Sequence, residues 1–165
     1  MQYAHAASRK EEPEAGFTLI ELMVGVLIIA ILIAVMIPTF VGAKQRAQDR
    51  AMQTSIRNAL TAAKVVYGER ADYTQATVAG LTAAEPGIKY VDATTTPTGQ
   101  NAVSVDPVST SYFRIAGKSN SGACFFVSDD ESSAGVGVLY AKGSGGSCTA
   151  SAAPAAGDPS WATTW

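Results

Sequence analysis

Residues 16–43 read GFTLIELMVGVLIIAILIAVMIPTFVGA, and this stretch decides the fold of the chain. From Phe17 to Ala43 the only ionisable side chain is that of Glu21. A helix needs about 20 predominantly apolar residues, at 1.5 Å each, to cross the roughly 30 Å hydrocarbon core of a bilayer. The stretch therefore predicts one membrane-spanning helix over residues 17–43.

The carboxylate of Glu21 requires a partner inside this apolar helix. An ionisable group costs about 2.5–3.5 kcal/mol at the centre of a span, and less near its end. The sequence offers no cation at that depth unless the chain is cut between Gly16 and Phe17, which creates a new α-amino group. Residues 17 and 21 share one face of a helix. The new amine is expected to pair with Glu21, either within one helix or between neighbouring copies.

The run GFTLIE at residues 16–21, followed by an unbroken apolar helix, resembles the class III signal segment of type IV pilins and type II secretion pseudopilins. The resemblance implies that a prepilin peptidase removes residues 1–16 as a leader by cutting after Gly16 on the cytoplasmic side. It also implies that Phe17 is then N-methylated, and that Glu21 guides methylation and the docking of subunits.

Pro38 lies where this family commonly has a helix-disrupting proline. A proline inside a helix lacks the N–H that would bond the carbonyl of Ala34, at a cost of about 3 kcal/mol or more. Gly42 weakens the same region further. Two interpretations remain open here, a static kink and a hinge that lets the helix bend or extend in a filament. The resemblance favours a hinge at Pro38 and Gly42.

Two other kinds of N-terminal segment are apolar as well, a secretory signal and a signal anchor. A secretory signal cut after Ala43 is disfavoured. The apolar region of such signals spans about 7–15 residues, and the apolar stretch of this chain is longer. An uncleaved signal anchor remains open. Two basic residues precede the span and three follow it closely, so the Lys/Arg count does not favour an N-terminus inside the cell. That orientation is implied by the resemblance alone.

Residues 44–68 predict an amphipathic helix that continues from the span without a break. Its apolar stripe is expected to pack under a sheet and consists of Met52, Ile56, Ala59, Leu60, Ala63, Val66 and Tyr67. The charged side chains expected to face water or neighbouring subunits are those of Lys44, Arg46, Asp49, Arg50 and Arg57.

Residues 69–165 predict a connecting loop followed by an antiparallel β head. Helical periodicity disappears after Gly68, and short β-prone runs alternate with turn-rich segments. The runs are 88–91, 102–105, 112–116, 124–128 and 136–141. The predicted fold class is α+β, with a long N-terminal helix packed against a small antiparallel sheet, as the resemblance to pilins also implies.

Cys124 and Cys148 are the only cysteines, and both lie in the part expected outside the cytoplasm. An even count in that setting favours a disulfide over two free thiols. The enclosed loop of about 25 residues corresponds to about 3–4 kcal/mol in the chain-entropy model. The resemblance implies a surface-exposed, disulfide-bounded loop, and residues 128–146 are the predicted contact surface.

Three consecutive acids, Asp129, Asp130 and Glu131, lie in that predicted loop. A solvated turn is the favoured interpretation, and a calcium site, as in some secretion pseudopilins, is the alternative. Trp161 and Trp165, near the C-terminal end of the sequence, are expected either to pack on the head or to offer a surface for partners.

The composition points away from catalysis. The only histidine, His5, lies in the predicted leader, and no metal-binding cluster or glycine-rich phosphate loop is present in the sequence. A net charge of −2 without a basic patch in the sequence does not indicate strong nucleic-acid binding. We therefore predict a structural protein without a cofactor or metal.

The function predicted is that of a pilin in a type IV pilus-like filament, with a type II secretion pseudopilin and a signal-anchored extracytoplasmic domain as alternatives. The resemblance implies as partners copies of the chain, other pilins, a prepilin peptidase, and a membrane platform with its assembly ATPase. It implies a single-pass protein of the cytoplasmic membrane before assembly, with the N-terminus inside, and an extracellular filament afterwards.

Overall fold

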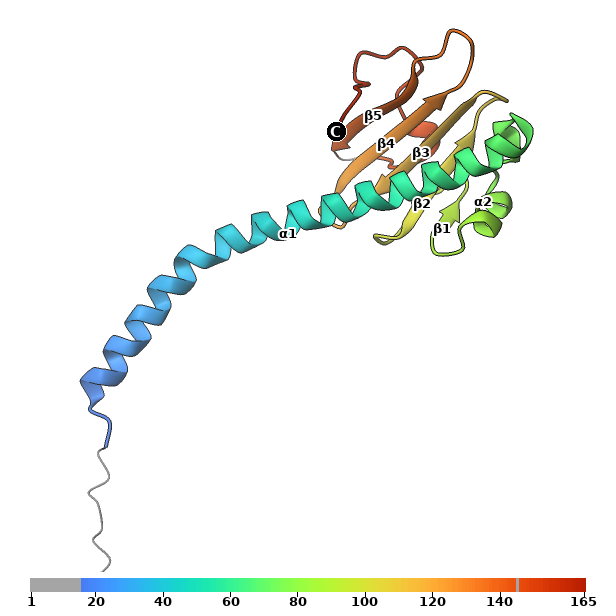
Figure 1. Ribbon diagram of the computed structural model, residues 1–165. Helices are drawn as coiled ribbons and strands as arrows, with labels where there is room; N and C mark the ends of the chain where they lie inside the picture. The colour runs from blue at the N-terminus through green and yellow to red at the C-terminus, as the bar shows by residue number, and fades with distance from the viewer. Residues whose placement is uncertain (1–15, 145) are drawn as a thin grey trace, which may run out of the picture. The chain divides into compact units, whose positions relative to one another are not determined.

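The computed structural model describes residues 16–144 and 146–165. Of the predicted leader, only Gly16 lies within these residues. The chain divides into two units, one ending at Phe40 and one comprising Val41–Trp165. Figure 1 shows the elements, which are α1 (Leu19–Arg70), the 3-10 turn η1 (Tyr73–Gln75), α2 (Val78–Ala84), β1 (Lys89–Val91), β2 (Ala102–Pro107), β3 (Tyr112–Lys118), β4 (Ala123–Asp130), β5 (Gly137–Ser144) and the 3-10 turn η2 (Ala150–Ala152).

Helix α1 is one uninterrupted element of 52 residues. The prediction of a single helix through the span and the amphipathic segment is confirmed. The helix begins after Thr18 and ends at Arg70, two residues beyond the predicted boundary. Its backbone is helical through Pro38 and Gly42 in this single chain.

The head is built on the second half of α1, which lies along one face of the sheet (Figure 1). The buried residues of α1 are Met52, Ser55, Ile56, Ala59, Leu60, Ala62 and Ala63. They form one core with apolar side chains from strands β1 to β4 and their neighbours, among them Tyr90, Val103, Val105, Phe113, Ile115, Phe125 and Val127. The predicted apolar stripe is therefore confirmed, and its last members, Val66 and Tyr67, are partly buried.

The five strands form one sheet in the order β1-β2-β3-β4-β5. Strands β2 to β5 are an antiparallel meander, as predicted. The purely antiparallel prediction is wrong at one edge, where β1 pairs with β2 in parallel through Tyr90 and Val103. Residues 92–101 carry the chain back to the end of the sheet where β1 began, and such a crossover makes neighbouring strands parallel.

The predicted connecting loop after residue 68 contains two helical turns that the sequence analysis missed. The Asp72 side chain caps η1 by accepting a bond from the Thr74 amide, 2.8 Å long. Thr77 caps α2, because its hydroxyl accepts a bond from the Gly80 amide at 3.2 Å. With seven residues, α2 is too short to show a helical period, so these caps were the usable signals.

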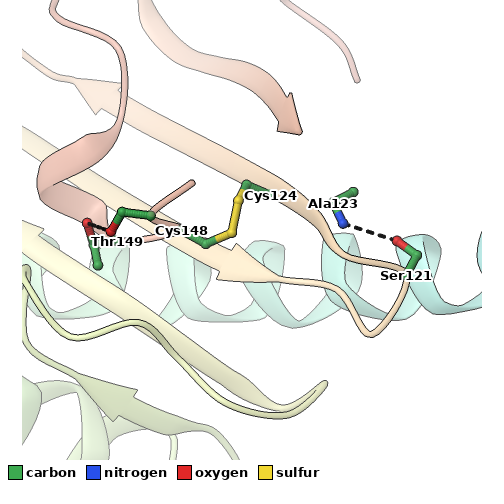
Figure 2. The surroundings of a disulfide bond; sticks show 6 residues. Ser121, Ala123, Cys124, Cys148 and Thr149 are labelled. Carbon is green, nitrogen blue, oxygen red and sulfur yellow. Dashed lines mark hydrogen bonds between the residues drawn. A yellow bond between two sulfur atoms is a disulfide. The ribbon is translucent and has the colours of Figure 1, made fainter. Parts of the chain in front are cut away.

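The C-terminal segment covers the second face of the sheet. Side chains alternate along a strand, so Phe125 faces α1 while Cys124 and Phe126 face the opposite side. There they pack with Ala150 and Ala153 and other residues of the C-terminal segment. The predicted disulfide is confirmed: Cys124 on β4 bonds Cys148 with a Cα–Cα distance of 5.3 Å (Figure 2).

The predicted disulfide-bounded loop is mostly a β hairpin. Strands β4 and β5 pair continuously between Ala123↔Ser144 and Asp130↔Gly137, so only residues 131–136 form a loop. The runs 124–128 and 136–141 predicted both strands, but β4 extends to Asp130 and β5 to Ser144, so paired strand takes up most of residues 128–146.

Both tryptophans of the C-terminal segment pack on the head. The Trp165 ring lies 5.0 Å from the rings of Phe125 and Tyr140, measured between centroids. Trp161 packs against the cluster around the disulfide, and Ala162 bonds Tyr140 through both backbone groups, at 2.7 and 2.8 Å. Of the two expectations for these residues, packing on the head is the one that the structure supports.

Gly117 on β3 provides a test of the contact between helix and sheet. A Cβ at this position would lie 2.3 Å from the Met52 sulfur and 3.0 Å from Ile56. We expect Gly117→Ala to lower the free energy of unfolding by about 1–3 kcal/mol through overpacking. The measurement is chemical denaturation of the mature chain in detergent. Gly68→Ala is the matched control, because nothing lies within 4 Å of its new Cβ, and it should be neutral or slightly stabilising.

Candidate processing and assembly segment

The first turn of α1 is a capping box formed by Thr18 and Glu21. Glu21 Oε2 accepts bonds from the Thr18 amide at 2.9 Å and the Thr18 hydroxyl at 2.6 Å. In return, the Glu21 amide donates to the Thr18 hydroxyl at 3.3 Å. Such reciprocal bonds satisfy amide groups that the start of a helix leaves without partners. The sequence T-x-x-E before an apolar run is the signal for this motif, which is not among the features predicted from the sequence.

Gly16, Phe17 and Thr18 precede the helix in exposed, non-helical backbone. The Phe17 side chain is 88% exposed. In the uncut chain the Phe17 nitrogen is part of a peptide bond, so the pair predicted between its amine and Glu21 does not exist at this stage. Thr18 holds the Glu21 carboxylate instead.

The apolar part of α1 buries almost nothing within the chain. Apart from Gly25, every residue from Phe17 to Val41 is exposed, and the large apolar side chains here are 48–88% exposed. The helix is long and apolar enough to cross a membrane, with a mean hydropathy of 3.0 over its most apolar window. Such a surface is stable only when lipid or other apolar side chains cover it.

The comparison with protein families places a known motif on this segment. A model of the prokaryotic N-terminal methylation motif matches residues 13–37. This is the prepilin-type motif of type IV pilins and pseudopilins. The pilin-type motif includes Gly16, Phe17 and Glu21 and ends just before Pro38. Searches of curated proteins and of solved structures returned no match. The long apolar helix, the small mixed sheet and the disulfide agree with the predicted α+β pilin fold.

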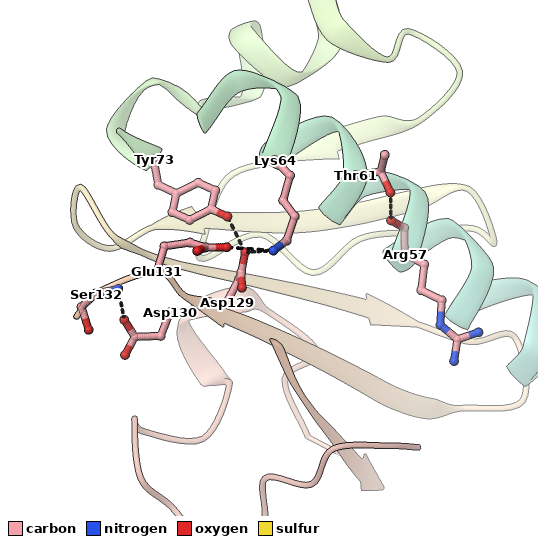
Figure 3. A network of polar contacts seen from close by, with 8 residues as sticks. All are labelled: Arg57, Thr61, Lys64, Tyr73, Asp129, Asp130, Glu131 and Ser132. Atoms are coloured by element: carbon pink, nitrogen blue, oxygen red, sulfur yellow. Dashed lines mark hydrogen bonds and ion pairs between the residues drawn. The ribbon is translucent and has the colours of Figure 1, made fainter. Parts of the chain in front are cut away.

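The head holds a polar network between α1, η1 and β4, shown in Figure 3. Lys64 Nζ lies 3.0 Å from Asp129 Oδ2 and 2.9 Å from Glu131 Oε1. The Tyr73 hydroxyl donates to the same Asp129 oxygen. Asp129 is fully buried, whereas the side chain of Lys64 is 41% exposed. The network fastens the C-terminal turns of α1 to the sheet.

The interpretation of residues 129–131 as a solvated turn is therefore wrong for Asp129. Asp129 lies on β4 and shares the helix-facing side of Val127 and Phe125, because side chains alternate along the strand. The calcium alternative also finds no support in the geometry, since Asp129 and Glu131 both bind the Lys64 ammonium. Within residues 16–144 and 146–165, no group of three or more His, Cys, Asp or Glu side chains is placed to hold a metal.

Both proton donors of the network are held in their protonated forms. Burial raises the pKa of Tyr73, and its hydrogen bond to Asp129 raises it further. For Lys64, partial burial acts to lower the pKa, but the bonds to Glu131 and Asp129 outweigh burial and hold the pKa above its ordinary value. Each group binds its proton more tightly in the folded chain than in the unfolded chain.

A second polar contact joins α1 to the sheet near the start of the head. Asp49 accepts a bond from the Ser121 hydroxyl and lies 3.5 Å from Lys142 Nζ on β5. Partial burial acts to raise the pKa of Asp49, but its bonds to Ser121 and Ser119 and the charge of Lys142 lower it overall. The expectation that Asp49 faces water is corrected, since it binds the sheet.

The network predicts a loss of stability at alkaline pH. The pKa values of Lys64 and Tyr73 are higher in the folded chain than in the unfolded chain, where they lie near 10. The contribution of these groups to the free energy of unfolding is therefore complete below the unfolded pKa values and is lost as the pH rises through the folded pKa values. Lys64→Met should lower the free energy of unfolding by about 2 kcal/mol at pH 8. This is less than the roughly 3–5 kcal/mol lost when a fully buried ion pair is broken, because Lys64 is partly exposed. Lys64→Met and Tyr73→Phe should both flatten the decline in unfolding free energy between pH 9 and 11.

The measurement is denaturant unfolding of the mature chain in detergent across this pH range. Lys118→Met is the control, since Lys118 is exposed and forms no ion pair among the described residues. An unchanged alkaline slope in both Lys64→Met and Tyr73→Phe would contradict the assignment.

Proposed function

We propose that the chain is the structural subunit of a type IV pilus-like filament, rather than an enzyme. The observation that carries the proposal is a helix that is apolar on all sides, exposed within the single chain, and preceded by the pilin-type motif. A bilayer covers such a helix because its backbone groups are bonded internally. Packed copies of the same helix cover it equally well, so one segment serves both storage in the membrane and the core of a filament.

The proposed processing follows from the position of the cleavage site. A prepilin peptidase removes residues 1–16, and the new amine of Phe17 is N-methylated. The bond between Gly16 and Phe17 lies in exposed, non-helical backbone ahead of α1, where a peptidase reaches it without unwinding a helix. Residues 17–43 then form the membrane and filament helix, residues 44–68 the helix of the head, and residues 69–165 its sheet and C-terminal segment.

Glu21 sets the register of assembly in this proposal. Both bonds from Thr18 end on Oε2 of Glu21, and no bond to Oε1 is found among the described residues. Oε1 therefore keeps its lone pairs for a further donor while the cap stays intact. The amine of Phe17 from a neighbouring copy supplies that donor. A subunit out of register leaves a charge without a partner in an apolar core, which is strongly unfavourable.

Pro38 and Gly42 are proposed as a hinge used on assembly. The helix is continuous there in the single chain, yet the Ala34 carbonyl has no amide partner at Pro38. Local melting at this point therefore breaks fewer bonds than elsewhere in the span. A filament density map with unbroken helix over residues 34–42 would contradict the hinge.

The proposed partners are copies of the chain, other pilins, the prepilin peptidase, and a membrane platform with its ATPase. The proposed monomer crosses the cytoplasmic membrane once with its N-terminus inside, and the filament is extracellular.

The experiment that tests the proposal is mass analysis and N-terminal sequencing of the protein from native membranes and from sheared surface material. A chain that begins with N-methylated Phe17 and is present in sheared filaments supports a pilin. The pseudopilin alternative rests on the same motif; it predicts a processed chain that stays with the envelope and whose loss traps secreted enzymes inside. A chain that begins at Met1 overturns both in favour of a signal anchor.

Substitution of Glu21 provides a sharper prediction. We expect Glu21→Val to be cut normally after Gly16 but to yield no filaments, because the amine of the neighbour finds no carboxylate. Glu21→Gln is the matched variant, since its amide oxygen can still accept the Thr18 bonds without carrying charge. It should also fail to assemble. The readouts are N-terminal mass for cleavage and the amount of sheared subunit for assembly, and normal filaments from either variant would exclude the register role.

A further inference from the structure

Charge is unevenly distributed along the head. Residues 44–57 carry four basic side chains and one acidic side chain, whereas residues 58–165 carry six basic and nine acidic ones. The single acid of the first group, Asp49, is already bound to Ser121 and Lys142. The start of the head is therefore positive and the remainder is negative.

Three exposed arginines on α1, Arg46, Arg50 and Arg57, form what we call the basic stripe. At 3.6 residues per turn they fall within about 40° of one another around the helix, and they extend over about 17 Å. The Arg57 guanidinium lies 6.0 Å from the centre of the Tyr140 ring, and Figure 3 shows it extending away from the acidic network. Within residues 16–144 and 146–165, none of the three forms an ion pair.

Four acids lie where α1 ends, namely Glu69, Asp72, Asp130 and Glu131, and we call them the acidic end. Bonds across the fold bring them together. Lys64 of α1 holds Glu131, the Tyr73 amide donates to the Thr110 carbonyl at 2.8 Å, and the Glu131 amide donates to the Ser111 carbonyl at 2.9 Å. Along α1, about 28 Å separate Arg50 from Glu69 at 1.5 Å per residue.

We propose that the basic stripe of one copy binds the acidic end of another copy, in a head-to-tail contact between heads. The proposal rests on the proposed function, because it concerns how subunits of a filament meet. When one copy follows another along the direction of α1, the positive start of one head meets the negative end of the next. These opposite charges attract each other. A contact between the basic stripes of two copies would instead bring like charges together, which is unfavourable. A contact between two different surfaces builds an open helical array when its rotation does not close into a ring.

Charge reversal in the full-length chain, expressed in its native host, tests the contact. We expect the double variant Arg50→Glu with Arg57→Glu to reduce the amount of subunit in sheared filaments about tenfold. The double variant Glu69→Lys with Asp130→Lys should reduce it to the same extent. The chain with all four changes should recover to within about twofold of wild type, because the attraction is restored with its direction reversed. Lys118→Glu is the control, since it makes the same charge change on an exposed residue of β3, and it should assemble normally.

Failure of the fourfold variant to recover overturns the proposal, as does normal assembly of both reversed chains. If anionic lipids bind the basic stripe instead, the arginine reversal alone lowers the yield and the acidic reversal has no effect, which is also a refutation.

Cross-linking in native membranes separates this proposal from the proposed function. The chain has no free cysteine among the described residues, so introduced thiols react specifically. A chain carrying both Arg50→Cys and Glu69→Cys should give a ladder of multimers with a bis-maleimide, whereas each single variant should stay monomeric, because each head-to-tail contact then holds only one thiol. Absence of the ladder overturns the head-to-tail contact. N-terminal mass from the same samples reports separately on cleavage after Gly16, so an uncut chain counts against the proposed function alone.

Discussion

Helix α1 is covered differently along its two halves, and the rest of the molecule depends on this constraint. In the first half, the large apolar side chains point in all directions and are exposed. In the second half an apolar stripe runs through Met52, Ile56 and Ala59, and these three side chains are completely buried in the head. The head can therefore complete its own core, whereas the first half obtains cover only from lipid or from other helices.

The apolar stripe alone would hold the head loosely in register. Two of its members, Ala59 and Ala63, are alanines, whose small side chains interlock poorly with a sheet. Two polar contacts supply the missing precision, because directional bonds penalise sliding. Asp49 binds Ser121 and Lys142 at the start of the head, and Lys64 binds Asp129 and Glu131 near its end. Between them they fix the helix along and across the strands.

The sequence predicted those features that repeat over many residues. The span, the amphipathic stripe and the four antiparallel strands each rest on a pattern that neighbouring residues share, and the two cysteines allow one pairing. The missed features depend on single contacts between distant residues. No residue near Asp129 in the sequence indicates that its side chain contacts Lys64 and Tyr73, so the sequence favours a solvated turn at the three adjacent acids. The parallel pairing of β1 likewise follows from the path of residues 92–101 and not from any local pattern.

The arrangement of the C-terminal segment has a consequence for the timing of folding. Cys148, Ala150, Ala153 and Trp161 cover the second face of the sheet, and Cys148 completes the disulfide with Cys124 on β4. These residues are synthesised after α1 and all five strands. A chain still being made holds α1 and most of the sheet, but its Phe126 and Cys124 face remains uncovered. The head therefore closes only after residues 148–161 have been made, and a chain that has just completed β5 still exposes an apolar face of its sheet.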